Sequence, residues 1–564
     1  MRLRIVESRL NQKIDQFCRD ESGGMLIFMV IAFFTMTIFG GLAVDLSNHE
    51  QRRTTYQTHL DNAVLAAASL SQQLDPEEVV FSYMSSAGLD PSVVNVETSE
   101  ENIGSILVGR TVYASLDGGV NTYFFRFFDI DSLGMTIEAQ ATERVEDIEI
   151  SLVLDVSGSM RNPTSDRSQR KIDALKQSAS DFVDAVLSDA EEGRVSISII
   201  PYSTKANAGE SLLSYYNATQ EHNYSHCVDF DAADYTNLAI NPSSRLQRTG
   251  HFQFQGASVY RKEQGEWTCR IDDGFPITPL SSSADDLKAQ IAKLTPEGST
   301  SIDMGAKWGL ALLDPSAQSA VTGLISEGVI DAAFRGRPHE HRAQNNMKVL
   351  VLMTDGENDD EFRLHSQYAS GQSDVVRSAS LSGDEVYYGI DSPEYSYRND
   401  SRYPTGERYF YFVHPTEGNK IWHNYTPKND PDLAHVAHRI VEKQLTWPEL
   451  WAEMSPFYYG YNLRGRQEPY SSWRENAMYN FWNRIHWEVS PTEKNTRLRN
   501  ICNAAEQAGI IVYSIGLEVD KPVSLALLKE CASTEAHYFD VNGTGIQTAF
   551  DMIAASISML RLTK

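Results

Sequence analysis

Several hallmarks of other protein classes are scarce or absent in this sequence. Five cysteines in 564 residues are too few for a disulfide-dense small scaffold. Lys and Arg number 49 against 76 Asp and Glu, and the resulting net charge of −27 opposes binding to nucleic-acid phosphates. The signatures H-E-x-x-H, G-x-S-x-G and G-x-x-x-x-G-K-[ST] do not occur. The sequence therefore supports neither a nucleic-acid-binding protein nor these enzyme classes.

Charged residues are also absent from one long apolar segment, residues 23–44. At about 1.5 Å per residue, a helix of this length spans the roughly 30 Å hydrocarbon core of a bilayer. A cleaved signal peptide would have a shorter apolar region of about 7–15 residues and a small-residue cleavage site. A buried core helix is a third interpretation. We expect an uncleaved transmembrane helix over residues 23–44.

Basic residues flank this segment unequally. Arg52 and Arg53 are the nearest ones after it, whereas five precede it: Arg2, Arg4, Arg9, Lys13 and Arg19. Basic flanks tend to stay in the cytoplasm. We therefore expect residues 1–22 to be cytoplasmic and the bulk of the chain to lie across the membrane.

The placement of the cysteines agrees with this orientation. Cys18 falls on the expected cytoplasmic side and has no partner there. The other four fall into two local pairs, Cys227 with Cys269 and Cys502 with Cys531. An oxidising compartment would allow both disulfides. Four free thiols are the alternative, and zinc is disfavoured because no C-x₂-C spacing occurs.

Residues 45–75 predict a membrane-proximal helix. They contain neither Pro nor Gly, and an apolar helical stripe runs along them: Tyr56, Leu60, Val64 and Ala67. Such a helix would pack either on its own domain or in a filament.

Residues 76–146 indicate a small mixed α/β module. We expect a helix over 77–87, strands over 105–108, 111–114 and 135–139, and a turn at Asp117-Gly118-Gly119.

Strands and helices alternate in the remainder of the chain. Expected strands cover 148–154, 195–199, 349–353 and 510–515, and expected helices cover 172–186, 304–312, 498–508 and 546–560. This alternation predicts an α/β fold with a doubly wound, mostly parallel sheet.

Oxygen-bearing side chains gather where these strands end. Asp155, Ser157 and Ser159 follow one buried strand, Asp355 follows another, and Thr300 precedes a helix. Ligands of such sheets bind at the carboxyl ends of the strands. Carboxylates and hydroxyls suit Mg²⁺, with Mn²⁺ or Ca²⁺ as alternatives. The competing interpretation is that these residues only form turns and helix caps.

These motifs resemble a von Willebrand factor A domain with a metal-ion-dependent adhesion site, covering residues 147–564. Asp155, Ser157 and Ser159 match its D-x-S-x-S, Thr300 its central threonine and Asp355 its T-D-G aspartate. Such a site would leave a metal coordination position open to a carboxylate of a partner protein.

The N-terminal region resembles TadG-like proteins of bacterial Flp (tight-adherence) pilus systems. The resemblance rests on residues 17–24, the apolar span, Leu42-Ala43-Val44-Asp45 and residues 57–70. Phe28 and Met29 stand where pilin-like relatives often carry Glu, which favours a stably anchored accessory protein. The resemblance implies a single-pass protein of the bacterial inner membrane with a periplasmic bulk.

Two insertions enlarge the second domain, at about residues 201–280 and 359–496. Both are rich in Tyr, Trp, Asn and acidic residues. They form either a recognition surface near the metal loops or a self-packed subdomain.

Together these features predict a binding protein rather than an enzyme. We expect a periplasmic, metal-dependent adhesion protein of Flp pilus assembly or surface attachment. Its partners would be a protein offering Asp or Glu, pilus components and the membrane, but no nucleic acid. The alternatives are a metal-dependent hydrolase using Glu357 or Asp360 as general base, and a structural minor pilin.

Overall fold

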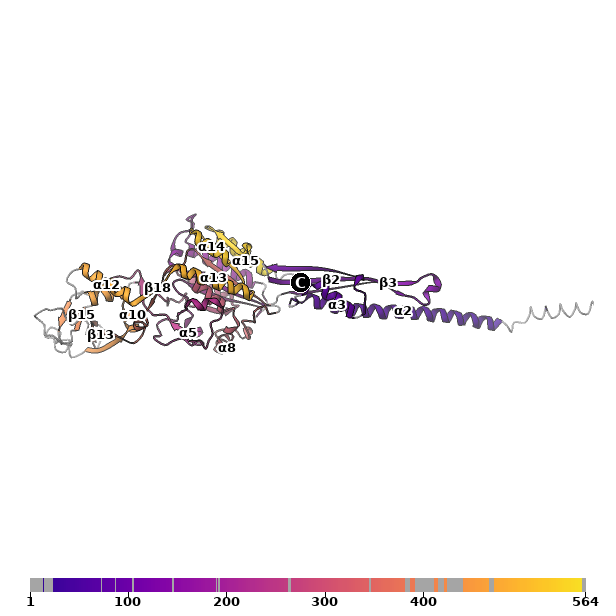
Figure 1. Ribbon diagram of the computed structural model, residues 1–564, viewed down its shortest axis with the longest axis horizontal. Coiled ribbons are helices and arrows are strands. Elements are labelled where there is room, and N and C mark those ends of the chain that lie inside the picture. Colours follow the sequence, from indigo (N-terminus) through magenta and orange to yellow (C-terminus); the bar gives the residue numbers. More distant parts are fainter. Residues whose placement is uncertain are drawn as a thin grey trace, which may run out of the picture. The chain divides into compact units, whose positions relative to one another are not determined.

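The computed structural model describes the chain with gaps: residue 14 and residues 24–70, 72, 74–86, 88–103, 106–144, 147–188, 190, 193–261, 265–343, 346–380, 386–390, 410–413, 420–423, 440–465 and 471–559. It divides into two compact units, shown in Figure 1. Unit 1 comprises residues 1–102 and 107–144, and unit 2 comprises residues 103–106 and 145–564. Cys18 and, apart from Ile14, the expected cytoplasmic segment lie outside the described residues.

Unit 1 contains one long helix, α2 (Gly24–Ala68). By length and composition this helix is able to cross a membrane, which is weak evidence for an anchor. The apolar side chains from Met25 to Ile31 are all exposed. The expected membrane segment and the expected membrane-proximal helix are thus parts of the same helix.

The second half of α2 packs on its own unit. It contacts α3 (Pro76–Ser86) and a three-stranded sheet in the order β1-β2-β3. The strands are β1 (Val94–Ile103), β2 (Ile106–Asn121) and β3 (Ser132–Arg144). The helix buries the expected stripe and its small neighbours in this core: Leu60, Ala63, Val64 and Ala67. Of the two interpretations of the stripe, packing on its own domain is the one that the structure contains.

The expected turn at Asp117-Gly118-Gly119 is wrong. These residues continue β2, where Gly118 pairs with Met135 and Asp117 accepts a hydrogen bond from the Thr136 hydroxyl at 2.7 Å. The chain reverses later, at residues 122–131. Glycines paired across an antiparallel ladder satisfy their backbone groups as well as a turn would, so the turn signal was misleading.

The core of unit 2 is a six-stranded sheet in the order β10-β5-β4-β11-β19-β20. Its strands are β4 (Asp147–Asp155), β5 (Val195–Tyr202), β10 (Thr278–Ser281), β11 (Asn346–Thr354), β19 (Ile511–Leu517) and β20 (Tyr538–Val541). Neighbouring strands are parallel except for the edge strand β10, which is antiparallel to β5. The sheet is therefore mixed, with a parallel centre.

Helices cover both faces of this sheet. Adjacent residues of β19 point to opposite faces. The Tyr513 hydroxyl meets Ser556 of α15 (Gly545–Met559), whereas the Ser514 hydroxyl donates to the Leu528 carbonyl of α14 (Pro522–Cys531). Further helices are α4 (Lys171–Leu187), α6 (Ala284–Lys293), α7 (Ile302–Ala311), α8 (Gln318–Ser326) and α13 (Pro491–Ala508).

The two insertions carry short elements. The first contains α5 (Gly209–Leu213), β6 (Val228–Asp229), β7 (Gln247–Arg248), β8 (Gln253–Gln255) and β9 (Glu266–Trp267). The second contains β12 (Glu361–Leu364) paired with β18 (His486–Val489), and a sheet of β13 (Gln372–Ser380), β14 (Val386–Ile390), β15 (Phe410–Val413), β16 (Lys420–His423) and β17 (Ile440–Thr446). Its helices are α9 (Ser366–Ala369), α10 (Trp447–Glu453), α11 (Pro456–Tyr458) and α12 (Ser471–Ile485).

Many aromatic side chains of the insertions pack on one another. Phe252 and Phe254 of the first insertion share one buried cluster with residues of the second, including Trp447, Trp451 and Tyr459. The described aromatic residues thus mainly form a self-packed core, although Tyr260 and Tyr479 are exposed.

Both expected cysteine pairs are joined in unit 2. Cys227–Cys269 lies within the first insertion, with Cα atoms 5.8 Å apart. Cys502–Cys531 ties α13 to α14, with Cα atoms 5.2 Å apart.

Candidate metal-binding site

Two of the expected carboxylates lie at the ends of neighbouring strands. Asp155 is the last residue of β4 and Asp355 follows β11, and these strands are parallel neighbours. Asp155 is fully buried and Asp355 is nearly so. The carboxylate of Asp155 accepts hydrogen bonds from the Ser157 N–H at 2.8 Å and from the Thr354 hydroxyl at 2.7 Å.

The hydroxyls of Ser157 and Ser159 connect the loop after β4 to Asp355. Ser157 Oγ lies 3.0 Å from Ser159 Oγ, and Ser159 Oγ donates to Asp355 Oδ1 at 2.6 Å. Oxygens separated by 196 residues in the sequence are thereby brought together. Four of the five predicted ligands therefore occupy one end of the sheet.

The loop that carries Thr300 contacts the loop after β4 through backbone groups. Gly158 N donates to Gly298 O at 2.8 Å, and a Cβ at Gly158 would lie 3.2 Å from that oxygen. Gly298 has a φ of +86°, which side-chain-bearing residues rarely adopt. The close approach thus depends on glycine at both positions.

The backbone carbonyl of Thr300 is bonded to a buried lysine, Lys494. Lys494 Nζ, in the first turn of α13, donates to the Thr300 carbonyl at 2.8 Å, to Ser301 Oγ at 2.7 Å and to the Asp359 carbonyl at 2.5 Å. Asp359 N also donates to the Thr300 carbonyl, at 3.0 Å. The backbone of Thr300 is fixed beside the serine loop, just before α7.

The burial of Asp155 alters its titration. Burial, and then the negative charge of Asp355, raise the pKa of Asp155 to about 6, against the opposing effect of the hydrogen bonds from Ser157 and Thr354. Burial and then the charge of Asp155 also raise the pKa of the Tyr202 hydroxyl. Two carboxylates that repel one another in a buried place would gain from a cation between them.

One cation of the chain is already close. Lys171 Nζ, at the start of α4, lies 3.1 Å from Asp355 Oδ2 and 3.7 Å from Glu518 Oε2. The ammonium group balances part of the negative charge of the carboxylates. Its ion pairs are with Asp355 and Glu518, whereas the oxygens of Asp155 accept from Ser157, Thr354 and, at 3.4 Å, the Tyr202 hydroxyl.

The donor set fits a hard divalent cation. Carboxylate and hydroxyl oxygens are the ligands that Mg²⁺ and Mn²⁺ favour, and two carboxylates balance the charge of one such ion. Within the part of the chain that the structure describes, no group of three or more His, Cys, Asp or Glu side chains is placed to hold a metal. A metal here would therefore depend on Asp155, Asp355 and the hydroxyls of Ser157, Ser159 and Thr300.

A buried network of charges lies next to these loops. Glu361 forms ion pairs with Lys205 and Arg363 inside the protein. Burial opposes ionisation of Glu361, but Lys205, Arg363 and Lys494 outweigh it and hold its pKa below the ordinary value. The network joins the start of the first insertion, through Lys205, to the start of the second, through Glu361.

The sequence reasoning missed the two lysines, Lys171 and Lys494. Both stand in the first turn of a helix, where a positive charge opposes the helix dipole. An unfavourable position of this kind is a signal that the side chain has a specific anionic or carbonyl partner elsewhere. Their partners lie 184 and 194 residues away, beyond the reach of local patterns.

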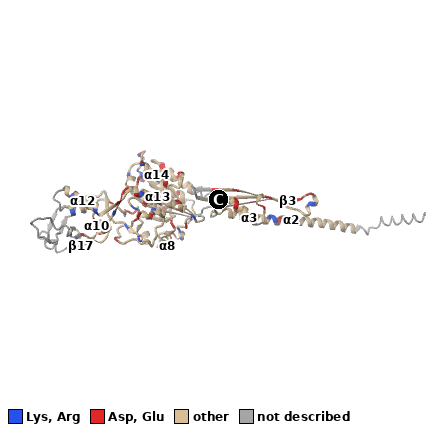
Figure 2. Cartoon of the chain, viewed as in Figure 1, with Lys and Arg blue, Asp and Glu red and all other residues tan. Residues whose placement is uncertain are grey.

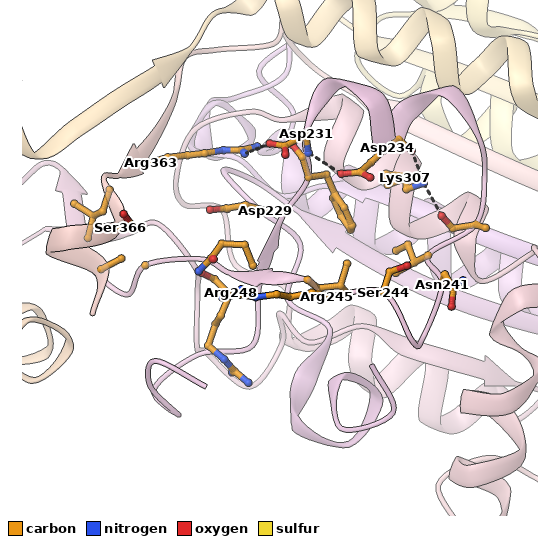
Figure 3. A pocket seen from close by; sticks show the side chains of 18 of the residues that line it. Asp229, Asp231, Asp234, Asn241, Ser244, Arg245, Arg248, Lys307, Arg363 and Ser366 are labelled. Atoms are coloured by element: carbon orange, nitrogen blue, oxygen red, sulfur yellow. Dashed lines mark hydrogen bonds and ion pairs between the residues drawn. The ribbon is translucent and has the colours of Figure 1, made fainter. Parts of the chain in front are cut away.

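A cavity also lies elsewhere in unit 2. It has a volume of about 670 Å³ and is lined by acidic and basic side chains, as Figure 3 shows. Lys307 points into its wall and donates to four backbone carbonyls, those of Asp234, Asn237, Leu238 and Ala239. None of the five candidate ligands lines it.

The fold and the site define a mixed α/β protein with oxygen-rich loops at one end of its sheet and a long apolar helix at its N-terminal side. Residues 23–70 match the model of a family described as putative Flp pilus-assembly TadE/G-like proteins. This match confirms the resemblance of the N-terminal region. No curated protein matches the chain.

Several solved structures are similar to parts of the chain. The vWF domain of the type V pili tip protein Mfa5 from Porphyromonas gingivalis is 14% identical, with a TM-score of 0.30, covering 74% of this chain and 98% of that one. The PilB minor pilin from Streptococcus sanguinis is 13% identical, with a TM-score of 0.28, covering 82% and 78%. The adhesive tip pilin GBS104 from Group B Streptococcus agalactiae is 11% identical, with a TM-score of 0.28, covering 73% and 100%. Because these TM-scores are low, the fold rests on the strand order and directions alone.

Proposed function

We propose that this protein is a membrane-anchored, metal-dependent binding protein of Flp pilus assembly or surface attachment. The observation that carries the proposal is the convergence of Asp155, Ser157, Ser159 and Asp355 at one sheet end, beside the Thr300 loop. The strand order and the helices on both faces favour a doubly wound sheet of the von Willebrand factor A type.

The ligand of this site would be a partner protein that offers Asp or Glu. Mg²⁺, or Mn²⁺ or Ca²⁺ in its place, would supply the positive charge that the partner carboxylate meets. Asp155 and Asp355 would neutralise the ion and the hydroxyls would orient it, while Lys494 holds the Thr300 loop. This is binding chemistry, so we propose no enzymatic turnover.

The proposed location is the bacterial inner membrane, crossed once by the apolar part of α2. The N-terminus would be cytoplasmic and unit 2 periplasmic. The family match over residues 23–70 supports the pilus setting. The two disulfides support an oxidising compartment for unit 2.

Calorimetric titration of the detergent-solubilised full chain with Mg²⁺ and Mn²⁺ tests the site. We expect binding to the wild type above the pKa of Asp155, and its loss in Asp155→Ala because the buried anion is removed. Glu357→Gln is the matched control, since this exposed carboxylate lies two residues after Asp355. Circular dichroism checks that both variants fold.

Two results would overturn the site. One is a wild type that binds neither ion, and the other is equal loss of binding in both variants. Metal-dependent phosphoester turnover that disappears in Asp155→Ala would instead favour the hydrolase.

A further inference from the structure

The tip of the β2–β3 hairpin exposes a cluster of large apolar side chains. The connection from residue 122 to residue 131 winds into a short 3₁₀ turn, Phe125–Phe128. The side chains are exposed by 71%, 82%, 53% and 41% in the order Tyr123, Phe127, Phe128 and Ile130. We call these four residues the tip cluster. Clustered exposed apolar side chains of this kind mark a contact surface.

Asp45 fixes this tip to α2. Its buried carboxylate accepts three backbone hydrogen bonds from the tip, from Tyr123 N at 3.0 Å, Phe124 N at 2.6 Å and Phe125 N at 2.8 Å. Charge-assisted hydrogen bonds to a carboxylate are the strong ones. Asp45 is also the first charged residue after the apolar segment of α2.

The tip reaches past Asp45 toward the apolar part of the helix. The ring of Phe124 packs so closely on Gly41 that a Cβ there would lie 2.1 Å from it. Asp45 and Gly41 are four residues apart, which is about 6 Å along a helix. Farther from the tip, His49 Nε2 contacts Gly134 O at 3.2 Å and Gln57 Nε2 donates to Glu138 O at 3.0 Å. The hairpin therefore lies along α2, with its tip beside the end of the apolar segment (Figure 1).

The part of α2 that precedes Asp45 has no charged side chains, and most of its large side chains are exposed. Figure 2 shows no Lys, Arg, Asp or Glu on the described part of α2 before Asp45. Most of its large side chains are exposed in the structure, from Met25 to Phe39. The tip cluster adjoins this apolar part of α2, so we expect both to face the same environment.

We propose that the tip cluster is a second membrane contact, which enters the interfacial layer of the bilayer that α2 crosses. Aromatic side chains concentrate at this layer because their rings suit its mixed polarity. Arg126 and Asp131 pair at 3.2 Å on the exposed side of the tip and would stay among the headgroups. The proposal rests on the membrane anchor of the proposed function, and it assigns the tip to lipid rather than to a protein partner.

Spin labels on the full chain test this proposal. Cys18→Ser removes the unpaired thiol, since the other four cysteines form disulfides. Single cysteines are then introduced as Phe127→Cys in the tip, Phe34→Cys in the apolar segment and Tyr83→Cys on α3. Tyr83 is the matched control, an exposed aromatic residue of the same unit away from the tip. The labelled chains are reconstituted into phosphatidylethanolamine–phosphatidylglycerol vesicles.

The readout is collision of each nitroxide with oxygen, which concentrates in lipid, and with a water-soluble nickel chelate. We expect the labels at Phe34→Cys and Phe127→Cys to be several-fold less accessible to nickel than the label at Tyr83→Cys, and more accessible to oxygen. If the label at Phe34→Cys reports lipid while that at Phe127→Cys behaves like that at Tyr83→Cys, the tip contact is overturned and the anchor stands. If the label at Phe34→Cys reports water, the anchor and the tip contact both fail.

Discussion

At the scale of single residues, His251 shows how burial couples a side chain to pH. Its ring stacks on Trp267 with centroids 4.0 Å apart, its Nδ1 lies 3.1 Å from the Ser225 hydroxyl, and the rings of His222 and Tyr224 also face it. Burial, and then the neighbouring His222, lower the pKa of His251 to about 3. The folded protein thus keeps this imidazole neutral.

This depressed pKa predicts a loss of stability in mild acid. An unfolded histidine titrates near pH 6.5, so below that pH the unfolded chain takes up a proton that the folded chain refuses until about pH 3. The contribution of neutral His251 to the free energy of unfolding is complete above pH 6.5 and declines as the pH falls. At pH 5 the loss should be about 2 kcal/mol. Denaturant unfolding of wild type and His251→Phe at pH 7.5 and about pH 5 measures it.

The variant should lose less stability between the two pH values than the wild type. His365→Phe is the control, because His365 is exposed and water reaches it in both states. Equal losses in the wild type and His251→Phe would contradict the prediction.

The placement of Asp155 and Asp355 at neighbouring strand ends was predictable from the sequence, but the lysines that contact this region were not. Asp155 and Asp355 each follow an apolar run that only a buried strand explains, so their meeting follows from the parallel sheet. Lys171 and Lys494 meet their partners through tertiary packing. Their first-turn positions signal that each has a partner, but no local pattern specifies which distant residue that partner is.

At the scale of elements, α13 supports the metal loops through its first turn. Lys494 is fully buried, and burial lowers the pKa of its ammonium group, against the raising effect of Asp303 and Glu361. It is nevertheless bonded to groups of the Thr300 and Asp359 loops. The helix therefore holds two loops of the candidate site in place.

Lys494→Met should weaken both the fold and the site. The carbonyls of Thr300 and Asp359 and the Ser301 hydroxyl would lose this donor. The buried carboxylates of Asp303 and Glu361 would also lose a neighbouring positive charge. We expect the free energy of unfolding to fall by on the order of 3 kcal/mol. Thermal unfolding and Mg²⁺ titration measure the two effects. Lys288→Met is the control, because Lys288 pairs with Asp184 at the surface and should change little. Unchanged unfolding in Lys494→Met would show that α13 does not support the loops.

The larger elements were easier to predict than their connections. The strand ending at Asp155 and the helix stopped by Gly509, with its φ of +78°, follow from apolar runs and a glycine. The hairpin of unit 1 did not follow. Its paired glycines read as a turn, because the sequence does not show which residues lie opposite them.

At the scale of the whole molecule, the two units have separate hydrophobic cores. The core of unit 1 joins α2, α3 and the three-stranded sheet, and a large core of unit 2 surrounds the parallel strands. The meeting of the two insertions in one aromatic cluster could not be predicted, because residues 281–358 separate them in the sequence and they share no repeat.

Separate cores predict two unfolding transitions, of which only one responds to reductant. The transition of unit 2 should have roughly three times the enthalpy of the other, in proportion to its length. Each disulfide of unit 2 should contribute about 3–4 kcal/mol through its closed loop. Cys18 is the only cysteine before Cys227, so reduction should leave unit 1 unchanged. Scanning calorimetry with and without reductant measures this, and equal shifts of both transitions would contradict it.

If α2 crosses a bilayer as proposed, its attachment to the hairpin would restrict the tilt of the helix. A lone helix whose apolar stretch exceeds the local bilayer thickness accommodates the excess by tilting. Here tilting would swing an attached hairpin as well, driving aromatic rings deeper on one side or lifting them into water on the other. With the tip seated, the protein would keep one preferred inclination, and the surrounding lipid would have to thicken or thin around it.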